Sequence, residues 1–331
     1  MKRITIIGTG YVGLVSGAGI SEFGHHVTCC DIDRDKIKEL KSGHIPIYER
    51  GLESLVKQNV TKGRLYFSSD VHKAIQDSEI IFISVGTPQG NDGESDLGAV
   101  ESVTKTIGEN LNGYKIICTK STVPVGTGKW IEDIIRTIQP KADFDYVSNP
   151  EFLREGAAIK DFMHPDRVVI GTRTSKALDV MREVYRALYI NETPILSTSV
   201  ETAEMIKYAS NSFLALKISY INEIANLCEA VGADVHQVAK AMGLDGRISP
   251  KFLHPGPGFG GSCFPKDTDA LAATGRKNNS PLPTIEAAIK TNVSQKTRMV
   301  GKLKGLVSDF NGKTIAVLGL AFKSQTDDVR E

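Results

Sequence analysis

The stretch R-I-T-I-I-G-T-G-Y-V-G, residues 3–13, decides the fold. A short β-branched run ends in a turn with the pattern Gly8-x-Gly10-x-x-Gly13, and the next apolar run, H-V-T-C-C-D, ends in Asp31. A strand, this glycine turn, a helix and an acidic residue about 20 positions further on make up the dinucleotide-binding fingerprint. The Asp31 carboxylate can accept hydrogen bonds from both ribose hydroxyls and would repel a 2′-phosphate. The stretch therefore predicts NAD rather than NADP, although a glycine turn in another doubly wound fold is the alternative.

The remainder of the first 199 residues alternates short apolar runs with segments of helical character. Alternation of this kind predicts a doubly wound, mostly parallel sheet with helices on both faces, that is, an α/β Rossmann-like domain over residues 1–199. We expect strands at 3–8, 26–32, 65–68, 79–85, 115–119 and 145–148, with 167–171 and 194–198 extending the sheet. We expect helices at 11–23, 34–41, 97–110 and 127–138.

The pattern changes near residue 200. Residues 200–231 contain no Pro or Gly and carry an apolar stripe at helical spacing, which predicts one long helix that suits a connector or a dimer core. Shorter helices are expected at 234–242 and 282–307, within a helical dimerisation domain over residues 200–308. The run K-T-I-A-V-L-G-L-A-F-K, 313–323, predicts the first strand of a further α/β domain. We interpret the chain as ending within that domain, as a truncated form or a fragment of a longer product.

Composition excludes several classes of protein. The 331 residues have a formal net charge of +1, which gives no reason to expect nucleic acid or an acidic membrane as a partner. No apolar run approaches membrane-spanning length, and the N-terminal apolar run is too short for a signal peptide. Five cysteines without metal-type spacing predict no metal site, and Cys29 and Cys30 are expected in a strand core. We expect a cytoplasmic protein.

Polar loops follow three of the predicted strands. They are S-V-G-T-P at 84–88, S-T-V-P-V-G at 121–126 and S-N-P-E-F-L-R-E-G at 148–156. Open α/β sheets bind ligands at the carboxyl ends of their strands, so these loops predict a binding site. Ser, Thr and Pro are also common in capped turns, which is the alternative. Lys36 can contact the ribose or pyrophosphate, or it can be a solvated helix residue.

Cys263 lies in the loop G-F-G-G-S-C-F-P-K-D and is a candidate nucleophile. The preceding segment, 254–262, is too rich in Gly and Pro for a helix or a central strand. Lys266 and Asp267 follow closely, and a nearby cation favours a thiolate. A reactive thiol beside a dinucleotide site suggests addition to an aldehyde carbonyl. An inert loop cysteine is the alternative.

Lys207 and Asn211 lie one turn apart on the predicted long helix. The i, i+4 spacing places them on one face, where an ammonium and an amide donor can stabilise the oxyanion of a carbonyl under attack. A solvated polar stripe is the alternative.

Six motifs in order resemble one known family along the whole chain. They are G-x-G-Y-V-G-L (8–14), G-T-P (86–88), S-T-V-P-V-G (121–126), N-P-E-F-L-R-E-G (149–156), E-M-I-K-Y-A-S-N-S-F-L-A-L-K (204–217) and F-G-G-S-C-F-P-K-D (259–267). On these motifs the chain resembles the UDP-glucose/GDP-mannose dehydrogenase family. The resemblance implies a four-electron oxidation of a nucleotide sugar at its primary alcohol, with two NAD molecules reduced in turn.

The resemblance also implies a role for each catalytic residue. Cys263 would hold the aldehyde as a thiohemiacetal and then as a thioester. Lys207 and Asn211 would stabilise the oxyanion, with Lys207 also a candidate acid or base. Asp267 would act on the hydrolytic water and pair with Lys207, and Thr122 and Glu151 would position water.

The same resemblance implies the binding residues and the partners. The substrate would contact Glu151, Phe152, Leu153, Arg154, Glu155, Lys207, Asn211, Arg247, Phe252, Leu253, His254, Pro255, Gly256, Gly260 and Lys323. The cofactor would contact Gly8, Gly10, Tyr11, Val12, Gly13, Asp31, Lys36, Thr87, Thr122, Glu155, Lys266 and Arg330. Arg247 would reach the sugar nucleotide of a neighbouring subunit, which implies a homodimer.

The stretch R-I-S-P-K-F-L-H-P-G-P-G-F-G-G-S-C-F-P-K-D, 247–267, is most similar to the branch that acts on UDP-glucose. GDP-mannose is the alternative substrate, because its dehydrogenases share the Cys, Lys, Asn and Asp. Two other readings stay open. One is a dimer that binds NAD without turning over sugar, and the other is a two-electron hydroxyacid dehydrogenase, which needs no Cys.

Overall fold

The computed structural model describes residues 1–90, 92–307 and 309–330. The chain forms two compact units: unit 1 is Met1–Pro88, Ser95–Lys207 and Lys323–Asp327, and unit 2 is Gln89–Glu94, Tyr208–Phe322 and Asp328–Glu331. The main boundary falls inside a continuous helix, between Lys207 and Tyr208. The division into three domains at residues 199 and 308 stays a prediction.

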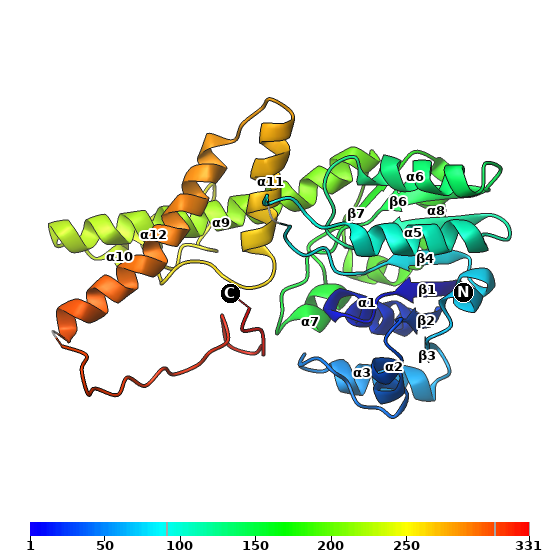
Figure 1. The fold of residues 1–331 in the computed structure, drawn as a ribbon, viewed down its shortest axis with the longest axis horizontal. Helices are drawn as coiled ribbons and strands as arrows, with labels where there is room; N and C mark the ends of the chain where they lie inside the picture. Colours follow the sequence, from blue (N-terminus) through cyan, green and yellow to red (C-terminus); the bar gives the residue numbers. More distant parts are fainter. Residues whose placement is uncertain (91, 308, 331) are drawn as a thin grey trace. The chain divides into compact units, whose positions relative to one another are not determined.

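Unit 1 is built on an eight-stranded sheet of order β3-β2-β1-β4-β5-β6-β7-β8 (Figure 1). All neighbouring strands are parallel except β6 and β7. The strands are β1 (Arg3–Ile7), β2 (His26–Cys30), β3 (Leu65–Ser68), β4 (Ile80–Ile83), β5 (Lys115–Thr119), β6 (Phe144–Ser148), β7 (Val168–Thr172) and β8 (Ile195–Thr198). The predicted strands and the doubly wound α/β class are confirmed.

Both faces of the sheet are covered, which explains why the central strands are apolar without alternation. Side chains alternate between the faces, so Ile4 and Ile6 of β1 join one core cluster and Ile7 joins the other. The first face packs against α1 (Tyr11–Glu22), α2 (Arg34–Lys41), α3 (Leu52–Thr61), α7 (Ala158–Met163), α8 (Ser175–Val184) and the 3-10 helix η1 (Arg186–Asn191). The second face packs against α4 (Val71–Asp77), α5 (Gly98–Asn110) and α6 (Thr127–Ile138).

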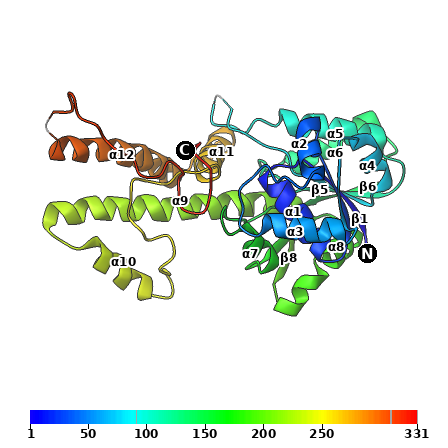
Figure 2. The ribbon, with the colours of Figure 1, turned by 90° about the horizontal axis from the view of Figure 1, so that it is seen from below.

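Unit 2 is helical. It contains most of α9 (Val200–Val231), which Figure 2 shows as one uninterrupted helix, together with α10 (Val235–Leu244), α11 (Phe264–Lys277) and α12 (Pro283–Leu306). The long helix and the two shorter predicted helices are confirmed, while α11 was not predicted. Two small clusters of buried side chains form the core of unit 2. One contains Tyr208, Ala270 and Leu271, and the other contains Ile221, Ala239 and Leu253.

Residues 313–323 do not form the predicted strand. They have no regular structure, and Val317 and Leu318 are largely exposed. The prediction was wrong because a strand needs a neighbour for its backbone hydrogen bonds, and no described segment of the chain pairs with this one. No helix among the described residues has both the length and the apolar character to cross a membrane.

Candidate active site

The glycine turn between β1 and α1 leaves space for a ligand. Gly8 has a φ of +101°, which side-chain-bearing residues rarely adopt, and a Cβ at Gly13 would lie 1.9 Å from the Gly8 carbonyl oxygen. A Cβ at Gly10, in contrast, would meet no described atom within 4 Å. The N-terminus of α1 receives no side-chain cap from the described residues. Open space beside Gly10 and the backbone N–H groups of α1 fit the pyrophosphate of a dinucleotide.

Asp31, directly after β2, is held as a carboxylate. Its Oδ2 accepts hydrogen bonds from the backbone N (2.9 Å) and the hydroxyl (2.7 Å) of Thr9, and its Oδ1 accepts one from the backbone N of Asp33 (3.1 Å). Burial alone would raise the pKa of Asp31, but these bonds and the Lys36 ammonium, 3.4 Å away, hold it below its usual value. The fingerprint carboxylate is therefore ionised near neutral pH. Contact of Lys36 with the cofactor stays a prediction.

Glu49 is a buried carboxylate that sequence reasoning missed. It accepts a short hydrogen bond from the hydroxyl of Tyr11, the first residue of α1. It also accepts bonds from the backbone N of Gly156 (2.7 Å) and of Ala158 (3.0 Å). Burial and the Glu49 carboxylate raise the pKa of Tyr11 well above its usual value, so the phenol stays protonated. Glu49 thus joins Tyr11, beside the dinucleotide turn, to the loop that follows β6.

The loops after β4 and β5 lie together, as their positions at one sheet edge predict. The Thr87 hydroxyl donates to the carbonyl oxygen of Thr122 (2.8 Å), and the Ser121 hydroxyl donates to that of Val85 (2.7 Å). These bonds fix the backbone around two of the predicted cofactor residues, Thr87 and Thr122.

Glu204, on the first turns of α9, holds the start of α6. Its carboxylate accepts hydrogen bonds from the backbone N of Gly126 (2.7 Å) and of Gly128 (2.8 Å), and the residue is 2% exposed. Burial raises the pKa of Glu204 to about 7, although the two N–H donors act in the opposite direction. Glu204 was not predicted, because its partners lie more than 70 residues away in the chain.

We expect Glu204 to make unit 1 less stable as the pH rises from about 4.5 to about 7. Over this range the folded chain keeps a proton that the unfolded chain releases, so the free energy of unfolding falls with pH, by about 1–3 kcal/mol. Urea unfolding at intervals from pH 4.5 to 8 should show a shallower fall in Glu204→Gln. Glu201→Gln is the control, because the Arg173 hydrogen bond lowers the pKa of Glu201. An identical slope in wild type and Glu204→Gln would contradict the prediction.

Glu151 and Lys207 form a buried ion pair in unit 1. The Lys207 Nζ lies 3.0 Å from the Glu151 Oε1, with side chains only 4% and 6% exposed. The Glu151 Oε2 accepts a bond from the backbone N of Leu153 (2.5 Å). Burial alone would raise the pKa of Glu151, but Lys207, the Leu153 bond and Lys120 together lower it. At neutral pH a fixed carboxylate therefore faces a fixed ammonium.

Two other residues of the 149–156 loop make cation contacts of their own. The Phe152 ring centre lies 5.4 Å from the Lys207 Nζ and 3.5 Å from the guanidinium carbon of Arg167. Arg154 forms an ion pair with Asp161.

A second buried lysine, Lys120, lies close by and was not predicted. It follows β5, is 5% exposed, and donates to the Asn149 Oδ1 (3.0 Å) and to the Tyr185 hydroxyl (3.2 Å). Burial lowers its pKa to about 8. A lysine directly after an apolar strand looks exposed in the sequence, and only its contacts with Asn149, after β6, and Tyr185, after α8, show that it is buried.

In unit 2, Asn211 and Asp267 are paired in the interior. The Asn211 Nδ2 donates to the Asp267 Oδ2 (2.6 Å), and the Lys266 Nζ lies 2.6 Å from the Asp267 Oδ1. Asp267 is 1% exposed, whereas the Lys266 side chain is 23% exposed. The structure therefore brings three of the predicted residues together within this unit.

Cys263 is the N-cap residue of α11 and is half-buried, whereas the other four cysteines are buried. Its sulfur lies 3.6 Å from the Ser262 hydroxyl oxygen. The N-terminal end of a helix favours a negative charge, so this position suits a thiolate.

Two asparagines hold the glycine-rich loop that leads to Cys263. The Asn222 Oδ1 accepts from the backbone N of Gly256 (2.8 Å), while Asn292 bonds both the backbone N (2.7 Å) and the carbonyl oxygen (3.0 Å) of Phe259. Gly258 has a φ of +123°, and a Cβ there would lie 2.5 Å from the Asn292 Oδ1. The predicted substrate loop is thus irregular but fixed.

The predicted substrate residues from 252 to 260 lie in unit 2, in the irregular segment between α10 and α11. Phe252 has a positive φ of 66°, Leu253 is buried in a core cluster, and His254, Pro255 and Gly260 continue the same loop.

Four further predicted residues are Arg247, in the segment after α10, and Glu155, Lys323 and Arg330, in or beside the C-terminal tail. Arg247 is exposed and forms an ion pair with Asp245. In unit 1 the Glu155 carboxylate accepts a bond from the Thr326 hydroxyl (3.0 Å), near Lys323, and in unit 2 Arg330 pairs with Asp328. Contact of these residues with substrate or cofactor stays a prediction.

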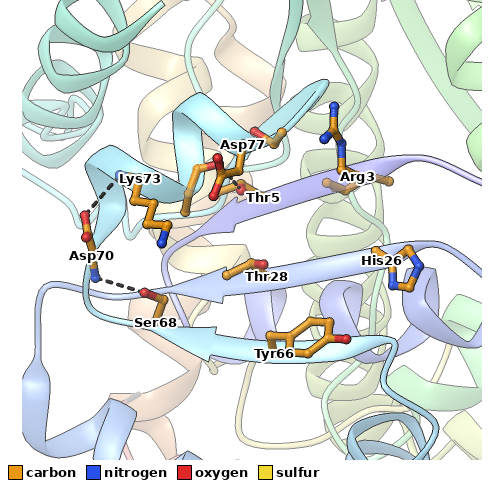
Figure 3. A pocket seen from close by; sticks show the side chains of 12 residues that line it. Arg3, Thr5, His26, Thr28, Tyr66, Ser68, Asp70, Lys73 and Asp77 are labelled. Carbon is orange, nitrogen blue, oxygen red and sulfur yellow. Dashed lines mark hydrogen bonds between the residues drawn. The ribbon is translucent and has the colours of Figure 1, made fainter.

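A groove of about 450 Å³ lies elsewhere in unit 1 (Figure 3). It crosses the polar side of β1–β3 beside α4 and is lined by Thr5, Thr28, Tyr66 and Lys73 among others. None of the predicted site residues lines it. Among the described residues, no group of His, Cys, Asp and Glu is placed to hold a metal ion.

Two models of one protein family match successive parts of the chain. Residues 2–189 match the NAD binding domain of the UDP-glucose/GDP-mannose dehydrogenase family, and residues 201–294 match its central domain. The chain is 54% identical to UDP-glucose 6-dehydrogenase TuaD of Bacillus subtilis over all its residues, covering 71% of that protein.

Two solved structures are also similar. The UDP-glucose dehydrogenase of Pyrobaculum islandicum has a TM-score of 0.97 at 38% identity, covering 100% of this chain and 77% of that one. The GDP-mannose dehydrogenase of Pseudomonas aeruginosa has a TM-score of 0.72 at 38% identity, covering 99% and 76%.

Proposed function

Because the chain belongs to the UDP-glucose/GDP-mannose dehydrogenase family, whose cofactor is NAD, we propose that it oxidises UDP-glucose to UDP-glucuronate. The observation that carries the proposal is the identity of 41–54% to several UDP-glucose 6-dehydrogenases over almost the whole chain. The glycine turn and Asp31 would hold the cofactor, with Tyr11, Val12, Thr87 and Thr122 beside them. NAD, when bound, accepts a hydride in each of the two oxidations.

In the first oxidation the C6 alcohol loses a hydride from carbon and a proton from oxygen, which gives an aldehyde. The proton would leave through a water molecule positioned by Thr122 and Glu151. The buried Glu151–Lys207 pair supports this role, because its carboxylate is ionised and held by Lys207. Lys207 is also a candidate acid or base.

In the second stage Cys263 would act as the nucleophile. Its thiolate adds to the aldehyde carbon, a C–S bond forms, and the Lys207 ammonium and Asn211 amide stabilise the oxyanion. Loss of the second hydride converts the thiohemiacetal into a thioester. Water, oriented by Asp267, then breaks the C–S bond and releases the carboxylate and the thiol. The half-buried position of Cys263 at the N-terminus of α11 supports this role.

We further propose that the protein is a homodimer through α9. Phe213, Tyr220, Leu227 and Val231 form an exposed apolar stripe on this helix, with side chains that a second copy could cover. Arg247, which is exposed, would then contact the sugar nucleotide of the neighbouring subunit. Sedimentation equilibrium of wild type and Tyr220→Glu would test this, and a wild-type monomer would contradict it.

The number of NADH molecules formed per sugar tests the reaction. We expect two NADH per UDP-glucose, measured by absorbance with the sugar limiting, and much slower reduction with GDP-mannose. One NADH per sugar would indicate a two-electron dehydrogenase without the thioester step. NAD binding without NADH formation from either sugar would favour a dimer that does not turn over, and faster reduction with GDP-mannose would assign the other branch of the family.

A further inference from the structure

Lys120 is a buried charge that the proposed chemistry does not use. Its ammonium lies in unit 1 at the carboxyl end of β5, with the Asn149 Oδ1 at 3.0 Å and the Tyr185 hydroxyl at 3.2 Å. The Tyr185 hydroxyl in turn donates to the Asn149 Oδ1 (2.6 Å), and the Asn149 Nδ2 donates to the carbonyl oxygen of Val169 (2.7 Å). These neutral partners fix the ammonium in place but do not neutralise it.

The ionisable groups around Lys120 come from four elements. They are Cys118 on β5, Glu151 after β6, Tyr185 before η1 and Lys207 on α9. Cys118 and Tyr185 stay protonated because burial raises both of their pKa values. Asn149, which accepts from the Lys120 Nζ (3.0 Å), lies two residues before Glu151 in the same loop, and the Glu151 Oε1 lies 3.0 Å from the Lys207 Nζ. The cluster therefore holds one buried carboxylate and two buried ammonium groups.

Burying a second ammonium at this position is energetically unfavourable. One lysine already satisfies Glu151, and a methionine of similar volume would fill the position of Lys120 without the cost of desolvating a charge. Anchoring Asn149 does not require a cation either, since a neutral donor would serve. Neutralising Glu151, filling the volume and anchoring Asn149 therefore do not account for a charged side chain at position 120.

We propose that Lys120 is a positioning residue that sets the proton affinities of Glu151 and Lys207 through its fixed positive charge. The proposal rests on the proposed function only for its kinetic consequence. A positive charge favours the ionised carboxylate and disfavours a proton on the neighbouring amine. Lys120 thus adds to the stabilisation that Lys207 and the Leu153 N–H give the Glu151 carboxylate, and it disfavours the proton on Lys207.

The kinetic test is the pH profile of kcat for NADH formation from UDP-glucose. Removing the charge raises the pKa of both Glu151 and Lys207, so in Lys120→Met both limbs of the profile should move to higher pH, by about one unit. Because the pKa of Glu151 lies below its usual value of 4.5 in the wild type, we expect kcat at pH 7 and KM for NAD to change little, so the effect appears as the displaced limbs. Lys120→Gln, which keeps a polar side chain, should show the same shifts and replaces Lys120→Met if that variant does not fold.

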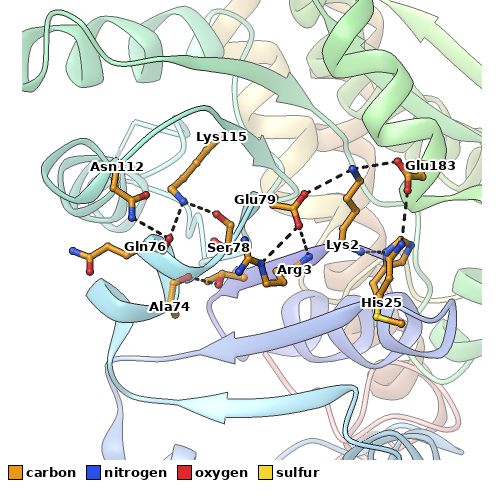
Figure 4. A network of polar contacts seen from close by, with 12 residues as sticks. Lys2, Arg3, His25, Ala74, Gln76, Ser78, Glu79, Asn112, Lys115 and Glu183 are labelled. Atoms are coloured by element: carbon orange, nitrogen blue, oxygen red, sulfur yellow. Dashed lines mark hydrogen bonds and ion pairs between the residues drawn. The ribbon is translucent and has the colours of Figure 1, made fainter.

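Lys115 provides the matched control. It is the first residue of β5, is also a buried lysine, and donates to the carbonyl oxygens of Gln76 (3.1 Å) and Ser78 (2.5 Å), as Figure 4 shows. Lys115→Met should lower stability without moving either limb. Unmoved limbs in both Lys120 variants would overturn the proposal and leave Lys120 as a structural anchor.

A double-mutant cycle tests the electrostatic coupling without substrate. Urea unfolding midpoints at pH 7 are compared for Lys120→Met, Glu151→Gln and the double variant. We expect a non-additive double variant, whereas Lys115→Met combined with Glu151→Gln should be additive. Additivity in the Lys120 cycle would overturn the proposal whatever the substrate is. If the cycle shows coupling but the wild-type protein does not oxidise UDP-glucose, the proposed function is overturned and the role of Lys120 is not.

Discussion

Cys263→Ser should lower the formation of UDP-glucuronate by at least about a thousandfold while NAD still binds. A serine hydroxyl is almost fully protonated at neutral pH, and the ester that it forms hydrolyses more slowly than a thioester. The variant should therefore stall after aldehyde formation or accumulate a covalent ester. NADH release from limiting UDP-glucose and the mass of the intact protein distinguish these outcomes.

Cys228→Ala is the matched control for the thiol. Cys228 lies on α9 in the same unit and is buried, so its removal leaves a small cavity but no change at the N-terminus of α11. We expect this variant to release two NADH per sugar as the wild type does. Full turnover by Cys263→Ser, with two NADH per sugar, would rule out the covalent role of Cys263.

The sheet could be predicted from sequence because its strands are buried on both faces. Ile80–Ile83 and Lys115–Thr119 are buried along their whole length, and such runs stand out against polar loops. The short helices α4 and α8 were missed. Asp70 caps α4 and Thr174 caps α8 through hydrogen bonds that the apolar pattern does not reveal.

The candidate site was predictable only where the residues that act together are also neighbours in the sequence. The glycine turn and the loop around Cys263 are contiguous motifs, so their residue types and spacing suffice. Glu49, Lys120 and Glu204 were missed because each takes its partners from segments far along the chain. An isolated charged residue in a sequence looks solvated, and only the folded chain shows that these three are buried.

Gly13→Ala should destabilise unit 1 by roughly 3 kcal/mol or more and abolish NAD binding. The added Cβ would lie 1.9 Å from the carbonyl oxygen of Gly8, and both atoms belong to backbone that cannot rotate away. The turn itself must move, which displaces α1 from β1. Urea unfolding followed by circular dichroism measures the loss of stability. A variant as stable as wild type would show that the turn is more plastic than its contacts indicate.

Gly10→Ala, three residues earlier, separates ligand fit from folding. Gly10 has an ordinary φ of −71°, and no described atom lies within 4 Å of the position of its Cβ. We therefore expect stability to change by less than about 1 kcal/mol. The methyl group would occupy space that we assign to the pyrophosphate, so NAD affinity should fall at least about tenfold by titration calorimetry. Unchanged affinity would mean that the phosphates approach α1 from another side, because nothing in the fold itself requires a glycine at this position.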